Sequence, residues 1–171
     1  KDAIKDLVKN VVPALATNYS NPKTKFLNHE YMVGGFSSMF MSRNRVRDWK
    51  QPSFTIQAGG RHAPLHPQAP KMEKVGVDRW RFKKGEEVLY RRLSVRECAR
   101  VQTFPDDYEF KYARVSDGYK MIGNAVPVEF AKRLAGRIAE DLKDCQSLTL
   151  KSRASGKVYT FKELLAEEMT A

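Results

Sequence analysis

The residues of this 171-residue chain that are best suited to binding chemistry are the cations between positions 43 and 84. This stretch holds eleven basic and three acidic residues, and it carries +8 of the net charge of +11. Aromatic and turn-forming residues are interleaved with the charges, which is typical of a nucleic-acid-binding surface. The alternative is a plain solvated basic face. We expect a polyanionic partner.

No pattern for covalent or metal chemistry accompanies these cations. Cys98 falls inside an expected helix and Cys145 follows another, and neither belongs to a nucleophile motif. His29, His62 and His66 are scattered, so the spacing of a zinc site is missing and we expect no metal. Two cysteines and the lack of a long apolar run indicate a reducing, cytoplasmic location without a membrane span.

The elements that must position the cations are expected to be short and irregular. Residues 2–12 have the apolar spacing of a short helix, with Asp2 as its N-cap. Three prolines between residues 61 and 70 favour an extended loop. Short strands are expected at residues 36–41, 53–58 and 86–92.

Longer helices are predicted towards the C-terminus. Ser94 and Glu97 have the spacing of a capping box, in which each side chain accepts a hydrogen bond from the other residue's amide, so a helix is expected over 95–103. A proline followed by apolar residues at every fourth position predicts a helix over 127–144. The tail is expected to contain a hairpin over 148–161 and a helix over 162–169.

Two sequence blocks carry a family resemblance. The first is Arg91-Arg-Leu-Ser-Val-Arg-Glu-Cys-Ala-Arg-Val-Gln-Thr-Phe-Pro-Asp106, and the second, Gly123-Asn-Ala-Val-Pro127, follows 17 residues later. In this order and at this separation they resemble the last two motifs of the DNA cytosine-5 methyltransferases. Ser94 stands where that family has threonine. Upstream, three blocks between residues 41 and 71 are similar to the target-recognition region of GGCC-specific bacterial methyltransferases.

The resemblance implies the C-terminal half of a two-domain enzyme. The fold class would be α+β, with a small, irregular, β-rich target-recognition domain and helices that complete the Rossmann-like catalytic domain of a partner. Residues 1–13 would be a helix docked on that catalytic domain, and residues 14–122, with the late motif at 91–106, would form the recognition domain. Residues 123–144 would return to the catalytic domain, and residues 145–171 would be an extra tail.

The resemblance also assigns roles to the cations. Arg43, Arg45 and Arg61 would read bases, because a planar guanidinium matches O6 and N7 of guanine in the major groove. The alternative for each is a phosphate contact, which positions DNA without specifying its sequence. Contacts with the DNA backbone are expected for Arg47, Lys50, Lys71 and Lys74. Polar contacts with DNA, or purely structural roles, are open for Thr55, Gln57 and His62.

The two late motifs would serve structure and cofactor binding. An ionic and hydrogen-bonded network that holds the recognition loops is expected for Arg92, Arg96, Glu97, Arg100 and Gln102. Contact of Arg92 or Arg100 with phosphate is the alternative. Asn124 and Val126, with Ala125 between them, would contact S-adenosylmethionine, a cofactor shared with the partner chain.

The family's Pro-Cys nucleophile and its glycine-rich donor loop are missing from this sequence. The chain is therefore expected to contain no catalytic residue and to act only with a polypeptide that carries the catalytic cysteine. The predicted function is target recognition for a bacterial restriction-modification methyltransferase, which methylates C5 of cytosine in a GGCC-like site of double-stranded DNA. A natural split subunit and a fragment of a longer enzyme both remain open.

Three other functions compete with this prediction. A stand-alone DNA-binding regulator derived from a methyltransferase would keep the cationic stretch but would have no use for Asn124 and Val126. Part of an RNA cytosine-5 methyltransferase would share the late motifs, although the recognition stretch is more similar to the DNA enzymes. A nucleic-acid-binding scaffold is the third. If the preferred hypothesis is correct, the predicted helices over 2–12 and 127–144 expose apolar faces when the chain is alone.

Overall fold

The structure is a computed structural model that describes residues 3–146, 149–151, 158–160 and 163. The chain separates into two units, Lys1–Pro127 and Val128–Ala171. Both helices and small sheets occur among the described residues, so the fold class is α+β. None of the described helices is long and apolar enough to cross a membrane.

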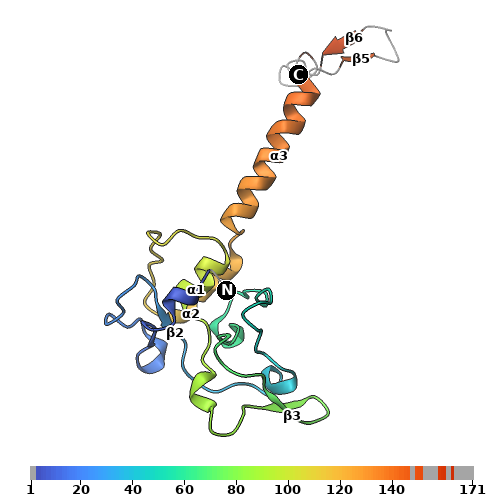
Figure 1. The fold of residues 1–171 in the computed structure, drawn as a ribbon. Helices are drawn as coiled ribbons and strands as arrows, with labels where there is room; N and C mark the ends of the chain where they lie inside the picture. Colours follow the sequence, from blue (N-terminus) through green and yellow to red (C-terminus); the bar gives the residue numbers. More distant parts are fainter. Residues whose placement is uncertain (1–2, 147–148, 152–157, 161–162, 164–171) are drawn as a thin grey trace. The chain divides into compact units, whose positions relative to one another are not determined.

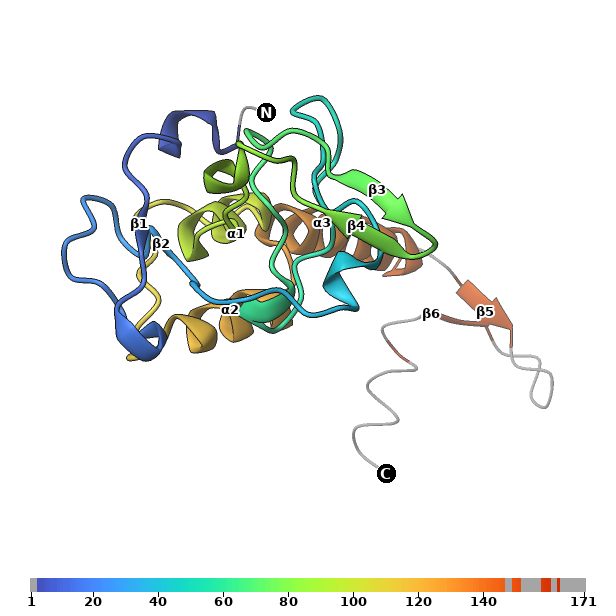
Figure 2. The same ribbon diagram turned by 90° about the horizontal axis from the view of Figure 1, so that it is seen from below.

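The first unit consists of single helical turns, short strand pairs and two α-helices. Its elements in chain order are η1 (Lys5–Leu7), β1 (Val12–Pro13), η2 (Ala16–Asn18), β2 (Glu30–Tyr31), η3 (Phe40–Ser42), η4 (Gly60–His62), β3 (Glu73–Gly76), β4 (Arg79–Arg81), η5 (Glu87–Leu89), α1 (Val95–Val101) and α2 (Val115–Asn124). β1 and β2 pair in parallel, whereas β3 and β4 form an antiparallel hairpin. Figures 1 and 2 show these two pairs on opposite sides of α1.

Two hydrophobic cores hold the first unit together. The larger core surrounds α1 and α2 and contains the buried side chains of Ile56, Cys98 and Tyr119. The smaller core joins η3 to the β3–β4 hairpin through Phe40, with Trp80 packed against it. Because the sheets have only two strands each, these buried side chains rather than strand pairing position most of the long loops.

Helix α1 begins at the predicted capping box. The amide of Glu97 donates to Ser94 Oγ at 3.0 Å, and the amide of Ser94 donates to the Glu97 carboxylate at 2.8 Å. Leu93 and Cys98, which flank this cap, are buried in the same core. The prediction of a capped helix is therefore confirmed, although the α-helix ends at Val101 rather than at residue 103.

The predicted N-terminal helix over 2–12 is wrong. Among the described residues only the single turn η1 forms, and its N-cap position is Ile4 without a side-chain cap. The Leu7 carbonyl accepts a hydrogen bond from the Asn10 amide at 3.3 Å, as in a tight turn, and a second one from His29 Nε2 at 2.8 Å. Ile4 and Leu7 are buried, so this segment does not expose the apolar face that was expected of it. Asp2 lies outside the described residues.

The three predicted strands at 36–41, 53–58 and 86–92 are also wrong. The first forms η3, the second is irregular and the third contains η5. No long neighbouring strand is available among the described residues to pair with them, so their apolar residues are buried as single anchors, such as Phe40 and Ile56. The predicted loop over 61–70 begins with the helical turn η4 and then follows an irregular path, apart from an isolated antiparallel bridge between Leu65 and Arg92.

In the second unit, α3 (Val128–Gln146) is followed by an antiparallel hairpin of β5 (Thr149–Lys151) and β6 (Val158–Thr160). The predicted helix over 127–144 and the predicted hairpin are confirmed. α3 has an exposed apolar stripe that consists of Phe130, Leu134, Ile138 and Leu142. Thr160 and Glu163 exchange the hydrogen bonds of a capping box, but the rest of the expected helix over 162–169 lies outside the described residues.

Candidate nucleic-acid interface

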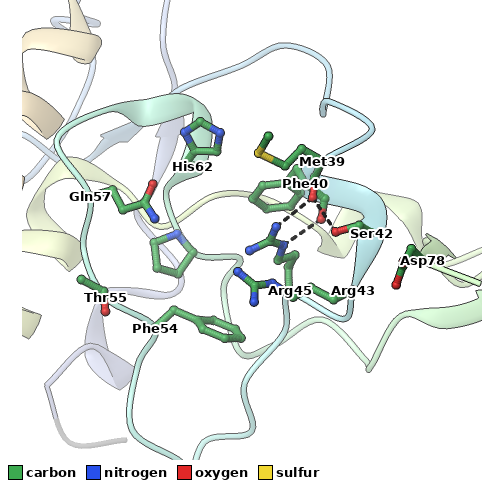
Figure 3. Close-up of a pocket in the computed structure, with 11 residues that line it drawn as sticks. Met39, Phe40, Ser42, Arg43, Arg45, Phe54, Thr55, Gln57, His62 and Asp78 are labelled. Carbon is green, nitrogen blue, oxygen red and sulfur yellow. Dashed lines mark hydrogen bonds between the residues drawn. The ribbon is translucent and has the colours of Figure 1, made fainter.

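A candidate site in the first unit is an open pocket of about 650 Å³. Three loop segments and the tip of the β3–β4 hairpin surround it, as Figure 3 shows. Its lining residues are Met39, Phe40, Ser42, Arg43, Arg45, Phe54, Thr55, Gln57, His62, Pro64 and Asp78. We call this pocket the arginine groove. It brings two of the three predicted base readers, Arg43 and Arg45, to one surface.

Arg43 and Arg45 are held differently within the arginine groove. The Arg45 guanidinium donates to the carbonyl of Phe40 at 2.7 Å and to that of Met39 at 2.9 Å. Burial, followed by the nearby charge of Arg43, lowers the pKa of Arg45. Arg43 is exposed. Arg45 therefore fixes the loop that carries Arg43, and the Arg43 side chain is available to a ligand.

The opposite wall of the groove is fixed by close glycine contacts with α2. Gly123 lies so close to Gln57 and Ala58 that a methyl group on it would overlap their backbone atoms. A methyl group on Gly60 would lie 2.7 Å from the ring of Tyr119 in α2, which is also too close. The segment before η4 can therefore reach its position only because both sites are glycine.

Arg61, the third predicted base reader, lies outside the arginine groove. It is exposed on η4, next to His62, which does line the groove. Its charge lies near Arg92, whose pKa is lowered mainly by burial and to a smaller extent by Arg61. The structure thus places Arg61 beside the groove rather than in it.

The predicted backbone contacts lie on the exposed surface of the first unit. Arg47, Lys50, Lys71 and Lys74 are all exposed. Arg47 is positioned over the ring of Phe54, at 4.2 Å from its centroid. Since Phe54 also lines the arginine groove, this cation lies at the edge of the candidate site.

A cluster of buried polar side chains at the start of α1 connects segments of the first unit that are distant in sequence. Arg91 donates two hydrogen bonds of 2.7 Å to the carboxylate of Glu97, and these two residues are 8% and 0% exposed. Burial raises the pKa of Glu97, but the Arg91 hydrogen bonds and charge outweigh it and leave the pKa below its usual value. His29 accepts from Ser94 Oγ at 2.8 Å. The sequence did not identify Arg91 or His29 as members of this cluster.

His66 completes the buried cluster as a neutral side chain. Its Nδ1 accepts from the amide of Gln68 at 3.1 Å, so Nε2 carries the proton. Nε2 lies 3.5 Å from the Glu97 carboxylate, close enough for electrostatic attraction but without a hydrogen bond. Burial lowers the pKa of His66 to about 4.

Lowering the pH from about 7 to about 5 is expected to reduce the free energy of unfolding by about 2 kcal/mol through His66. Between its ordinary pKa of 6.5 and the folded value of about 4, the unfolded chain binds a proton here and the folded chain does not. Stability is therefore lost as the pH falls. Urea unfolding at both pH values measures the change, and His66→Asn should reduce it. Equal stability at both pH values contradicts the assignment.

The other charged residues of the late motif bind the chain's own backbone and carboxylates. Arg92 donates to the carbonyls of Gly34 and Gly35 at 3.1 and 2.9 Å. Arg96 donates to the carbonyls of Leu27, Pro105 and Tyr108 at 2.7–3.0 Å. These bonds connect segments that are far apart in sequence.

Arg100 and Gln102 link α1 to further segments. Arg100 forms ion pairs with Asp106 and Asp6 at 2.7 and 2.6 Å, and these hold its pKa above the usual value. Gln102 donates a long hydrogen bond of 3.5 Å to the carbonyl of Ile122 in α2. Every side chain for which a motif network was expected therefore has a partner within the first unit.

The predicted cofactor residues end α2. Asn124 is the last residue of the helix and is exposed, Ala125 is its C-cap, and Val126 is 59% exposed. An exposed amide and an exposed aliphatic side chain two residues apart can contact a ligand that has both polar and apolar parts. The sequence analysis placed this segment just before the helix predicted over 127–144 and missed that α2 precedes it.

Cys98 is not suited to act as a catalytic nucleophile, and the described residues contain no candidate metal cluster. Cys98 is fully buried in α1, and burial raises the pKa of its thiol well above the usual value. A thiol in this state is neither accessible nor ionised. No group of three or more histidine, cysteine, aspartate or glutamate residues could hold a metal in the described part of the chain.

Known proteins resemble this chain over most of its length. A family model described as C-5 cytosine-specific DNA methylase matches residues 1–140. The chain is 60% identical over 144 residues to the type II methyltransferase M.MthTI of Methanothermobacter thermautotrophicus, a match that covers 84% of this chain and 43% of the relative.

Two further relatives give the same picture. M.FnuDI of Fusobacterium nucleatum is 52% identical over 149 residues, which covers 86% of this chain and 43% of the relative. M.NgoPII of Neisseria gonorrhoeae is 53% identical over 143 residues, which covers 84% of this chain and 42% of the relative. Both are type II methyltransferases by name. The chain thus spans less than half the length of the curated relatives it matches.

Proposed function

Because the chain belongs to the C-5 cytosine-specific DNA methylase family, we propose that it is the target-recognition part of a bacterial restriction-modification methyltransferase. Together with a catalytic part, it directs transfer of a methyl group from S-adenosylmethionine to C5 of cytosine in a GGCC-like site. The observation that carries this proposal is the arginine groove, which presents Arg43 and Arg45 on a rigid support in the most basic stretch of the chain.

The groove has the chemistry that a guanine-containing site requires. Guanine presents two acceptors, O6 and N7, in the major groove, and a guanidinium can donate to both. Arg43 is exposed and free to make this contact. Arg45 donates two hydrogen bonds to backbone carbonyls of its own loop and thereby fixes the loop that carries Arg43. Arg61 beside the groove is the third proposed base reader. The exposed cations Arg47, Lys50, Lys71 and Lys74 are proposed to hold the DNA backbone on either side.

In this proposal the chain contributes one wall of the methyl-donor site, and the catalytic part contributes the nucleophile. S-adenosylmethionine, when bound, supplies an electrophilic methyl group. Asn124 and Val126, with Ala125, fit a role as one wall of its site, through an amide hydrogen bond and an apolar contact. The nucleophilic cysteine is proposed to belong to the catalytic part, because Cys98 is buried with a raised thiol pKa and the family's Pro-Cys pair is missing from this sequence. We propose that the apolar stripe of α3 docks on that part, which completes a Rossmann-like domain.

Two observations favour this function over the alternatives. A stand-alone regulator has no use for an exposed Asn124 and Val126 at the end of α2. The family model that matches most of the chain describes DNA methylases, which favours DNA over RNA as the substrate. Since the substrate is bacterial DNA, the proposed location is the cytoplasm.

Substituting Arg43→Ala is expected to relax discrimination at one guanine by about 1–3 kcal/mol, because the exposed guanidinium is the proposed base reader. Binding of the full chain to a GGCC duplex is compared with binding to duplexes in which one base pair is changed. Loss of the preference at one position, with the other preferences unchanged, is the expected result.

Lys71→Ala provides the matched control for this experiment. A phosphate contact contributes to every duplex, so this variant is expected to weaken all duplexes alike and to reduce the salt dependence by about one unit of slope. If Arg43→Ala also weakens all duplexes alike, Arg43 contacts phosphate and not a base. If the unmodified chain has no preference for GGCC, the proposed recognition function is wrong.

A further inference from the structure

The arginine groove contains one acidic residue, and nothing above gives it a role. Asp78 lines the groove together with Arg43 and Arg45, and it is exposed. Figure 3 shows it at the edge opposite Thr55 and Gln57. A carboxylate repels DNA phosphates, so an acid at this place weakens simple backbone binding. The Asp78 carboxylate is therefore better suited to a group on the ligand that donates hydrogen bonds than to a phosphate.

The β3–β4 hairpin holds Asp78 in a defined place. Asp78 lies in the turn between the two strands with a backbone φ of +49°, a left-handed conformation that aspartate tolerates better than most residues. The hairpin is closed by the ion pair between Glu73 and Arg81 at 2.9 Å. The Asp78 backbone is thus set by strand pairing on both sides of the turn.

The hairpin and the arginine loop share one hydrophobic core. Trp80 of β4 packs against the core that includes Phe40 of η3, and Phe40 supplies the carbonyl that holds Arg45. Met72, just before β3, accepts a hydrogen bond from the Arg45 amide at 3.2 Å. The hairpin that carries Asp78 and the loop that carries Arg45 are therefore supported by the same packed side chains.

We propose that Asp78 determines specificity by accepting a hydrogen bond from the 4-amino group of a cytosine in the recognition site. Aspartate and glutamate are suitable acceptors for this group in the major groove. A site made only of G·C pairs offers one kind of major-groove donor, the cytosine amino group, beside the guanine acceptors that the arginines read. The groove thus matches both edges of a G·C pair. This inference rests on the proposed function.

Duplexes in which one cytosine of the site is replaced by pyrimidin-2-one, which lacks the 4-amino group, test the proposal. The full chain is expected to bind one such duplex about tenfold more weakly than the GGCC duplex. Asp78→Ala should discriminate between these two duplexes about tenfold less than the unmodified chain does, because it lacks the acceptor for the 4-amino group. Changes in the stability of the duplex itself are the same for both proteins and cancel in the comparison.

Glu87→Ala, which removes an exposed acid outside the groove, is the matched control. It should discriminate against the pyrimidin-2-one duplex as the unmodified chain does. The proposal is overturned if Asp78→Ala keeps that discrimination and merely binds every duplex more tightly, since Asp78 then acts only by repelling phosphate. If the unmodified chain does not prefer GGCC over other duplexes, the proposed function is wrong. The inference about Asp78, which rests on it, is then wrong as well.

Discussion

Glu97→Gln is expected to lower the free energy of unfolding by about 3–5 kcal/mol, because it leaves the buried Arg91 guanidinium without its counter-charge. The two side chains share two hydrogen bonds of 2.7 Å and are almost inaccessible to water. Glutamine fills the same volume, so the loss reports the missing charge and not a cavity. Urea unfolding at neutral pH measures it.

Glu73→Gln is the matched control, since it breaks an ion pair of similar length on the surface. Glu73 and Arg81 are separated by 2.9 Å, but their side chains are 38% and 61% exposed. The expected cost is below about 1 kcal/mol, because water and salt screen the pair. Equal losses of unfolding free energy in the two variants would mean that the buried Arg91–Glu97 pair stabilises the fold no more than a surface ion pair does.

Gly123→Ala is expected to lower the free energy of unfolding by about 1–3 kcal/mol, the usual cost of an added methyl group in a packed site. The new methyl group would overlap the backbone of Gln57 and Ala58, which cannot rotate away as a side chain can. The loop that carries Gln57 and Thr55 must move, so discrimination between DNA sequences should fall as well. Urea unfolding and binding to single-substitution duplexes measure the two effects.

Gly136→Ala on α3 provides the contrast, because nothing beyond its own neighbouring helix backbone lies within 4 Å of the added methyl group. Alanine favours a helix over glycine by up to about 1 kcal/mol, so this variant should be neutral or slightly more stable. DNA discrimination should be unchanged. If Gly123→Ala behaves in the same way as Gly136→Ala, the first glycine of the motif at 123–127 does not fix the recognition loop.

Local signals in the sequence predicted those elements that depend on local interactions. The capping box at Ser94 and the four-residue apolar repeat after Pro127 each specify a helix through neighbours within one or two turns. The hairpin between β5 and β6 follows from alternation around a turn. These three predictions are confirmed by the structure.

Elements that depend on distant contacts were predicted wrongly or missed. The turn at Leu7 is held partly by a distant residue, because its carbonyl accepts a hydrogen bond from His29 as well as from the nearby Asn10 amide. Helix α2 was missed because Gly118 and Gly123 weaken a helical pattern. Glycine occupies these two positions because Gly118 packs closely against Tyr112 and Gly123 packs closely against the Gln57 backbone. The β3–β4 turn at Asp78 lacks a glycine signal.

The candidate site was predicted by residue type but not by arrangement. The basic stretch and the family resemblance together selected Arg43, Arg45 and Arg61. They did not indicate that Arg45 would bind its own loop, that Arg61 would lie beside the groove, or that Asp78 would line it. These facts follow from the core that joins η3 to the hairpin, which no local pattern encodes.

Transfer of a labelled methyl group from S-adenosylmethionine to a GGCC duplex tests the proposed function most directly. The chain is mixed with the part of M.MthTI that it does not match, and the two corresponding parts of M.MthTI are mixed as the positive control. We predict no transfer by the chain alone, transfer to GGCC by the mixture, and none to a duplex with one base pair changed. Transfer by the chain alone, or an inactive mixture beside an active control, would contradict the account.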